Sequence, residues 1–193
     1  MINMDATVTS IRLKSDEELQ ELYDRKVRHL YLGIESGLDD VLKFMRKEHT
    51  QDQAYKEIAR IQKVGLIFDA HVMSGVAGKG RGQENAIALA EFLNKTQPDH
   101  IVNFSLFLHN QVALYEDIKS GAFIPADEVE NMEEERTLIE LLKEGPDGHQ
   151  MLYDGFNDFL ELRVKGKVPK DAPRMIEKLT EKNIKTSRRF MPM

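Results

Sequence analysis

A glutamate at the end of an apolar run is the first candidate for chemistry in this sequence. Glu35 closes the run Leu30–Ile34 and is followed by Ser36 and Gly37. A carboxylate in that position can accept hydrogen bonds from the hydroxyl or amine groups of a ligand, or it can simply be solvated. Lys47 follows a helical pattern further along the chain. It can place a cation near Glu35 or be an ordinary surface lysine.

A second candidate is the glycine-rich stretch from Gly75 to Gly82, "GVAGKGRG". It lies between a predicted strand and a predicted helix, where glycines let the backbone approach a ligand and a helix N-terminus can hold an anion. The stretch matches neither the Walker loop nor the dinucleotide fingerprint, so a flexible loop is the alternative. His71, inside a predicted strand, is either a satisfied core histidine or a ligand-binding residue. The histidines lack metal-motif spacing, so we expect no metal site and assign no catalytic residue.

Alternating strand and helix patterns position these residues. Strands are predicted at Ile2–Val8, His29–Ile34, Ile67–Met73 and Ile101–Leu108. Helical spacing predicts the connecting helices, with Ser15 and Glu18 as a capping box before one of them. This order is typical of parallel βαβ units. We therefore expect an α/β fold: a partial (β/α) barrel of the TIM type, with about four parallel strands and flanking helices.

The pattern changes after Leu108. Three helical stretches are predicted there, at Val112–Ser120, Glu128–Lys143 and Ala172–Lys182. We expect a partial barrel over residues 1–110 and a helical C-terminal extension over residues 111–193, packed on the barrel. Ligands of parallel α/β folds bind beyond the carboxyl ends of the strands. Glu35, the glycine-rich stretch and His109 all follow predicted strands, so we expect them at one edge of the sheet.

Composition limits the possible functions. The chain has 193 residues, a net charge of -6 and no cysteine. This charge gives no electrostatic footprint for nucleic acid or an anionic membrane. Neither a signal peptide nor a spanning apolar run is evident, so we expect a cytoplasmic location. Without cysteine, the chain has neither a thiolate nucleophile nor thiolate ligands for an iron–sulfur cluster.

Two long stretches together resemble the radical S-adenosylmethionine superfamily. They are "LYLGIESGLDDVLKFMRKEHT" and "GLIFDAHVMSGVAGKGRGQENAIALAEFLNKTQPDHIVNFSLFLHNQVALYEDIKSGAF". They look like the later barrel strands of its oxygen-independent coproporphyrinogen oxidase-like and Fe–S oxidoreductase branch. The resemblance covers nearly the whole chain and implies a C-terminal portion of such an enzyme. The family's cysteine motif, which holds a [4Fe–4S] cluster, is missing.

The resemblance implies S-adenosylmethionine as cofactor and assigns contact positions. Asp5 matches a carboxylate near the methionine amine, Glu35 a ribose contact, and Lys47 a cation near the methionine carboxylate. His71 falls where some members have a ribose-binding aspartate, which puts that contact in doubt. The glycine-rich turn near the adenosine is matched by two residues, Gly75 and Gly78.

Two hypotheses for the function follow from these observations. In the first, the chain is part of a radical S-adenosylmethionine oxidoreductase and is inactive without a cluster-bearing N-terminal region or partner. In the second, it is a non-catalytic binding or scaffold protein derived from that fold. Because a half-barrel exposes an edge strand and an apolar face, we expect a homodimer. The alternative is that the segment from Gln150 to Met193 covers the opening and keeps the chain monomeric.

Overall fold

The computed structural model describes residues 1–157 and 162–189, and the side chains of its last helix as far as residue 183. Six strands form one sheet in the order of the chain. Neighbouring strands from the first to the fifth are parallel, and the sixth pairs with the fifth in the antiparallel direction. The strands are β1 (Ile2–Ala6), β2 (Val27–Glu35), β3 (Ile67–Ser74), β4 (His100–Ser105), β5 (Met151–Asn157) and β6 (Leu162–Val168).

The connecting segments are helical. They comprise α1 (Val8–Arg12), α2 (Asp16–Asp24), α3 (Asp39–Phe44), α4 (Gln51–Lys63), α5 (Gly82–Thr96), α6 (Leu114–Ser120), α7 (Glu128–Leu141), the short 3₁₀ turn η1 (Pro146–Gly148) and α8 (Ala172–Arg189). Among the residues that the structure describes, no helix combines the length and apolar character needed to cross a bilayer.

The four predicted strands are confirmed as parallel neighbours in chain order, which is an α/β arrangement. Two of them end earlier than predicted. Thr7 has extended backbone and its hydroxyl accepts a hydrogen bond from the Ser10 amide at 3.0 Å, so α1 begins at Val8 where the sequence predicted strand. β4 ends at Ser105 instead of Leu108.

Local capping explains where two of the helices begin. Ser15 and Glu18 form the predicted capping box of α2. Thr50 and Gln53 form a second one at the start of α4, and Gly65, with a φ of 87°, follows the end of that helix. A glycine adopts this left-handed conformation at little cost. The helices predicted between the first four strands are confirmed as α2, α3, α4 and α5.

The expected helical C-terminal extension is wrong in one respect. Helices α6, α7 and α8 lie near the predicted positions, but the same region also supplies β5 and β6. β5 pairs with β4 in parallel, so the sheet continues across the boundary expected at residue 110. The sequence "NDFLELRVKGKVP" predicts an extended, polar-edged segment there but not a strand of the main sheet, because exposed cations alternate with buried residues along β6.

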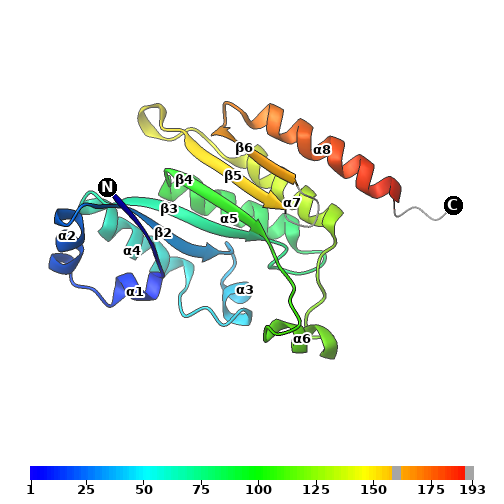
Figure 1. The fold of residues 1–193 in the computed structure, drawn as a ribbon, viewed down its shortest axis with the longest axis horizontal. Helices are drawn as coiled ribbons and strands as arrows, with labels where there is room; N and C mark the ends of the chain where they lie inside the picture. The colour runs from blue at the N-terminus through cyan, green and yellow to red at the C-terminus, as the bar shows by residue number, and fades with distance from the viewer. Residues whose placement is uncertain (158–161, 190–193) are drawn as a thin grey trace.

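The two faces of the sheet differ. Figure 1 shows α4, α5 and α7 behind the sheet, covering one face. Alternate residues of β2 and β3 are buried under these helices, among them Leu30, Leu32, Phe68 and Ala70. The residues between them point to the other face, since side chains alternate along a strand. That face, here called the open face, carries Tyr31, Glu35 and His71 in half-buried positions.

Candidate functional site

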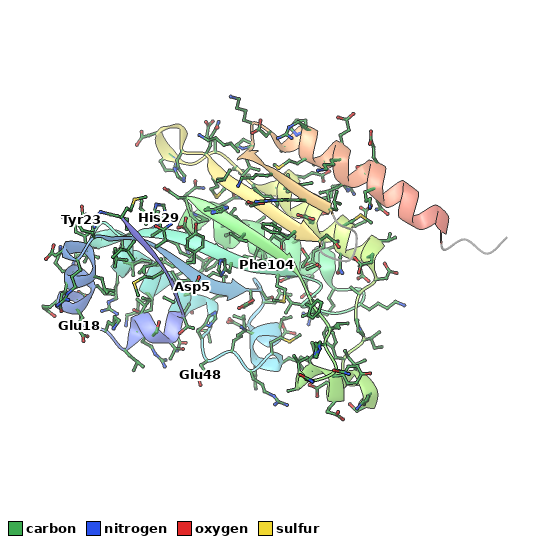
Figure 2. All side chains as sticks on the ribbon, in the orientation of Figure 1. Asp5, Glu18, Tyr23, His29, Glu48 and Phe104 are labelled. Atoms are coloured by element: carbon green, nitrogen blue, oxygen red, sulfur yellow. The ribbon has the colours of Figure 1, made fainter. Side chains whose placement is uncertain are left out.

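A cavity of about 690 Å³ lies beside the carboxyl ends of β1 and β2. Four of the six residues predicted to contact a cofactor line it: Asp5, Glu35, Lys47 and His71. Figure 2 labels Asp5 on β1, at the front of the sheet, and Glu48 below it, which lines the same cavity. The structure therefore brings together residues that are up to 66 positions apart in the sequence, from position 5 to position 71.

Backbone geometry aims the Glu35 side chain into this cavity. The register between β2 and β3 shifts between Gly33 and Glu35, and Glu35 has a φ of 64°. A Cβ atom added at Gly33 would lie 2.8 Å from Glu35 Oε1. The absence of a side chain at Gly33 thus lets the carboxylate lie over the strand. Non-glycine residues with positive φ cost free energy and are concentrated at functional sites.

Glu35 is paired with Lys47. The Lys47 Nζ atom lies 2.7 Å from Glu35 Oε1, and the two side chains are 40% and 16% exposed. The Lys47 amide donates to the Leu42 carbonyl at 2.9 Å, which ties the lysine to the end of α3. Both charges remain partly accessible, so a ligand carboxylate can reach the ammonium while a ligand hydroxyl or amine reaches the carboxylate.

Two histidines of the cavity are held mainly neutral near pH 7. Burial, and then the nearby Lys47 charge, lower the pKa of His49. Burial also lowers the pKa of His71, against the opposing effect of Asp5 and Glu35. His49 is buried, and its Nε2 has no hydrogen-bond partner among the described residues. A neutral imidazole can donate and accept, so His49 offers an unused polar atom beside the ion pair.

The predicted glycines lie elsewhere. Gly75 has a φ of 79°, its amide donates to Glu134 Oε2 at 2.8 Å, and an added Cβ would lie 2.6 Å from Asn131 Oδ1. It is packed beneath α7. Gly78 lines a separate hollow of about 370 Å³, together with Phe44 and Phe123. Neither glycine lines the cavity that holds the other four residues, and their contact with a cofactor stays a prediction.

The sequence analysis did not identify the buried hydrogen bonds that hold the residues after Glu35 in place. Ser36 Oγ donates to Asn85 Oδ1 at 2.6 Å, and Asn85 Nδ2 donates to Glu134 Oε1 at 2.7 Å. This chain of hydrogen bonds connects the residue after Glu35 to α5 and α7. A polar residue on the apolar face of an Ala-rich helix was the available signal for Asn85.

Tyr31 and His49 also line the cavity without having been predicted. Tyr31 lies on the same face of β2 as Glu35, four residues away, and opposite Asp5 in the β1–β2 register. The period of two along a strand could have identified it once Glu35 was chosen. His49 lies in the connection between α3 and α4, where no period applies.

The residues present do not fit an iron–sulfur cluster. The chain has no cysteine. Within residues 1–157 and 162–189, no group of three or more histidine or acidic side chains is arranged to hold a metal ion. The donor set of the cavity suits an organic zwitterion instead, because it combines a carboxylate, an ammonium and neutral imidazoles.

Comparison with known proteins gives partial matches, although no family model matches the chain. It is 33% identical over 101 residues to tRNA-2-methylthio-N(6)-dimethylallyladenosine synthase of Acinetobacter baumannii (strain AYE), covering 50% of this chain and 20% of that protein. It is 24% identical over 120 residues to tRNA uridine(34) acetyltransferase of Methanocaldococcus infernus, covering 62% and 22%. The chain thus spans about a fifth of the length of these curated relatives.

A solved structure has the same fold. Elp3 of Methanocaldococcus infernus, with an N-terminal deletion of residues 1–46, superposes with a TM-score of 0.66 at 17% identity. The match covers 95% of this chain and 41% of that one. The fold defines a mostly parallel α/β protein with its cavity at the carboxyl ends of the strands. These relatives confirm the resemblance to the radical S-adenosylmethionine superfamily, of which the chain resembles a C-terminal portion. The coproporphyrinogen oxidase-like branch stays a prediction.

Proposed function

We propose that this chain is the S-adenosylmethionine-contacting, C-terminal portion of a radical S-adenosylmethionine oxidoreductase-like protein, inactive on its own. The observation that carries this proposal is the convergence of Asp5, Glu35, Lys47 and His71 on one cavity. These residues are far apart in the sequence, yet they lie where ligands of parallel α/β folds bind. The relatives support the family; the cofactor contacts and the lack of activity are our proposal.

The side chains suit the ends of S-adenosylmethionine. Asp5 can accept from the methionine amine, Lys47 can donate to the methionine carboxylate, and Glu35 can accept from the ribose hydroxyls. Tyr31 and His71, whose ring centroids are 5.2 Å apart, offer apolar surface beside them. With a reduced cluster, this cofactor supplies a 5'-deoxyadenosyl radical in the intact family. In this chain the proposed role of the residues is to bind and orient it.

The missing cluster ligands limit what the chain does alone. In the family the cluster also holds the methionine amine and carboxylate, so its absence removes a major anchor. We therefore expect S-adenosylmethionine to bind too weakly for calorimetry and to leave the chain inactive. A cluster-bearing region or partner chain, acting in the cytoplasm, would complete the site.

Nuclear magnetic resonance at millimolar ligand tests this proposal, because it detects weak binding and locates it. Titration with S-adenosylmethionine should shift the amide signals of Glu35, Lys47 and His49. Glu35→Gln removes one charge of the pair and should weaken binding about tenfold, since charge-assisted hydrogen bonds contribute roughly 1.5–3 kcal/mol.

Glu116→Gln is the matched control, because Glu116 forms an exposed pair with Lys119 at 2.9 Å on α6, outside the cavity. It should bind like the unaltered chain. Shifts confined to the Gly78 hollow, no shifts at all, or a tight isotherm for the chain alone would contradict the proposal.

A further inference from the structure

A row of aromatic side chains crosses the open face of the sheet, beyond the cavity. The His71 ring lies 5.2 Å from Tyr31 and 5.5 Å from Phe104. Phe104 stacks on Phe156 at 5.9 Å, and the Arg163 guanidinium lies 4.5 Å from the centre of the Phe156 ring. The row therefore runs over five neighbouring strands, from β2 to β6, and only its first two members line the cavity.

The outer part of this row faces away from the helices. Phe104 is 38% exposed, although it belongs to a central strand of the sheet. Its neighbours Val102 and Asn103 are both buried. Figure 2 shows Phe104 on the side of the sheet that faces the viewer, with α5 and α7 behind it. Phe104 therefore presents part of its apolar surface to solvent rather than to the core.

The end of the row at β6 is positively charged. Arg163, Lys165 and Lys167 alternate on the exposed side of β6. The carboxylate of Asp154 accepts from Arg163 at 2.6 and 2.7 Å and from Lys165 at 2.9 Å. Two cations thus share one carboxylate, and Lys167 adds a third positive charge on the same side of the strand, in a chain whose net charge is -6. Lysine has three donors and arginine five, so their bonds to Asp154 leave donors for an anion.

We propose that Phe104 and Phe156, with the cations of β6, bind a planar heteroaromatic ligand that carries an anionic group, as a nucleotide does. A base has the flat apolar surface that stacks on aromatic side chains on an open sheet face. Its phosphate would have the charge that Arg163 and Lys165 complement. This binding site does not depend on the proposed function. Only the further step of identifying the bound nucleotide as a substrate rests on the proposed function.

Three probes separate the two parts of this recognition. Adenosine 5'-monophosphate has the plane and the anion, adenosine has only the plane, and inorganic phosphate has only the anion. Titrations followed by nuclear magnetic resonance should give the tightest binding for the monophosphate, with shifts at Phe104, Phe156 and Arg163. Equal affinity for phosphate and for the monophosphate would overturn the stacking role.

Two variants assign the parts to residues. Phe104→Leu should weaken the monophosphate and adenosine alike, by about tenfold, in line with the stacking of one base on one aromatic ring. Lys165→Gln should weaken the monophosphate severalfold and leave adenosine unchanged. The matched controls are Phe107→Leu, at an exposed phenylalanine after β4, and Lys119→Gln, at an exposed lysine of α6. Circular dichroism verifies that each variant is folded.

Competition between two ligands distinguishes this site from the proposed cofactor site. Repeating the monophosphate titration with S-adenosylhomocysteine present should leave its affinity unchanged, because the two sites use different residues. Displacement by S-adenosylhomocysteine, or a folded Phe104→Leu variant with undiminished binding, would overturn the inference. If the row binds the monophosphate but Glu35→Gln has no effect on S-adenosylmethionine, the cofactor proposal fails and this inference stands.

Discussion

Two adjacent carboxylates are buried where α7 crosses the strand ends. Glu134 accepts from Asn85 at 2.7 Å and from the Gly75 amide at 2.8 Å. Glu135 accepts from the Tyr153 hydroxyl at 3.0 Å. Burial raises the pKa of each to about 7, against the opposing effect of these hydrogen bonds. A group with such a pKa couples the stability of the fold to pH.

Replacement of Glu135 by glutamine should remove part of this coupling. Because its folded-state pKa is raised from 4.5 to about 7, the folded chain binds the proton more tightly than the unfolded chain. Its contribution therefore favours folding at low pH and is lost as pH rises through that interval. Between pH 5 and pH 8, the free energy of unfolding should fall by up to about 3 kcal/mol more in the unaltered chain than in Glu135→Gln.

Urea unfolding at the two pH values measures this difference. Glu140→Gln, on the exposed side of α7, is the control and should keep the slope of the unaltered chain. Equal slopes for the unaltered chain and Glu135→Gln would show that Glu135 does not titrate in this range.

Asn85 is the residue whose loss should disturb the Glu35 turn most. Its side chain is fully buried and accepts from Ser36 Oγ at 2.6 Å and from the Gly37 amide at 3.2 Å. Asn85→Ala leaves buried polar groups without partners, which costs roughly 2–4 kcal/mol of unfolding free energy. Asn94→Ala, on the same helix but half-buried, should cost less than half as much by urea unfolding. Equal losses of unfolding free energy in Asn85→Ala and Asn94→Ala would show that Asn85 does not stabilise the Glu35 turn more than an ordinary helix residue does.

At the scale of elements, local signals predicted most of the sheet. Ser15 and Glu18 fixed the start of α2, and the apolar runs of β2, β3 and β4 identified three buried strands. β5 and β6 escaped because their evidence is non-local. Asp154 is buried in β5 and is compensated by its ion pairs with Arg163 and Lys165 of β6. Without that pairing, β6 reads as a charged surface segment.

The candidate site likewise contains residues that the sequence indicated and residues whose position depends on non-local contacts. Family resemblance assigned cofactor contacts to Asp5, Glu35, Lys47 and His71, of which only Glu35 was also indicated by its strand-end position, and in the structure all four line one cavity. The same resemblance assigned Gly75 a contact near the adenosine, but in the structure Gly75 lies outside this cavity, covered by Glu134 and Asn131, which are more than 50 residues away in the sequence. A helix that packs over a loop through buried carboxylates leaves no mark in the sequence around that loop.

For the whole molecule, the two edges of the sheet are finished differently. At β6, Lys178 of α8 donates to the Arg163 carbonyl at 2.6 Å and Arg174 donates to the Lys165 carbonyl at 2.8 Å. At β1, the other edge, Ile2 and Met4 are 48% and 40% exposed. In its described residues, the segment after Gln150 extends the sheet beside β4 and packs α8 against α7 and β6. These described residues lie at the opposite edge of the sheet from β1, which argues against the alternative in which the C-terminal segment covers the opening.

An exposed edge strand with apolar side chains favours association. We therefore predict a homodimer joined on the β1 side. Light scattering at micromolar concentration should give twice the 22.2 kDa mass of one chain. Met4→Lys places a charge on the edge and should shift the mass toward one chain. A mass of 22.2 kDa for the unaltered chain would reject the dimer.

Iron reconstitution tests the missing cluster. After anaerobic incubation with iron and sulfide, the desalted chain should be colourless and should retain no stoichiometric iron, because it has no thiolate ligands. Retention of about four irons per chain, the content of a [4Fe–4S] cluster, with absorbance in the visible range would overturn this prediction.

A crystal structure of the chain with S-adenosylhomocysteine at millimolar concentration would show directly whether this cavity binds the cofactor. We expect the ligand in the 690 Å³ cavity, with its carboxylate near Lys47, its amine near Asp5 and its ribose hydroxyls near Glu35. A ligand bound in the Gly78 hollow, or oriented with its ribose away from Glu35, would contradict it.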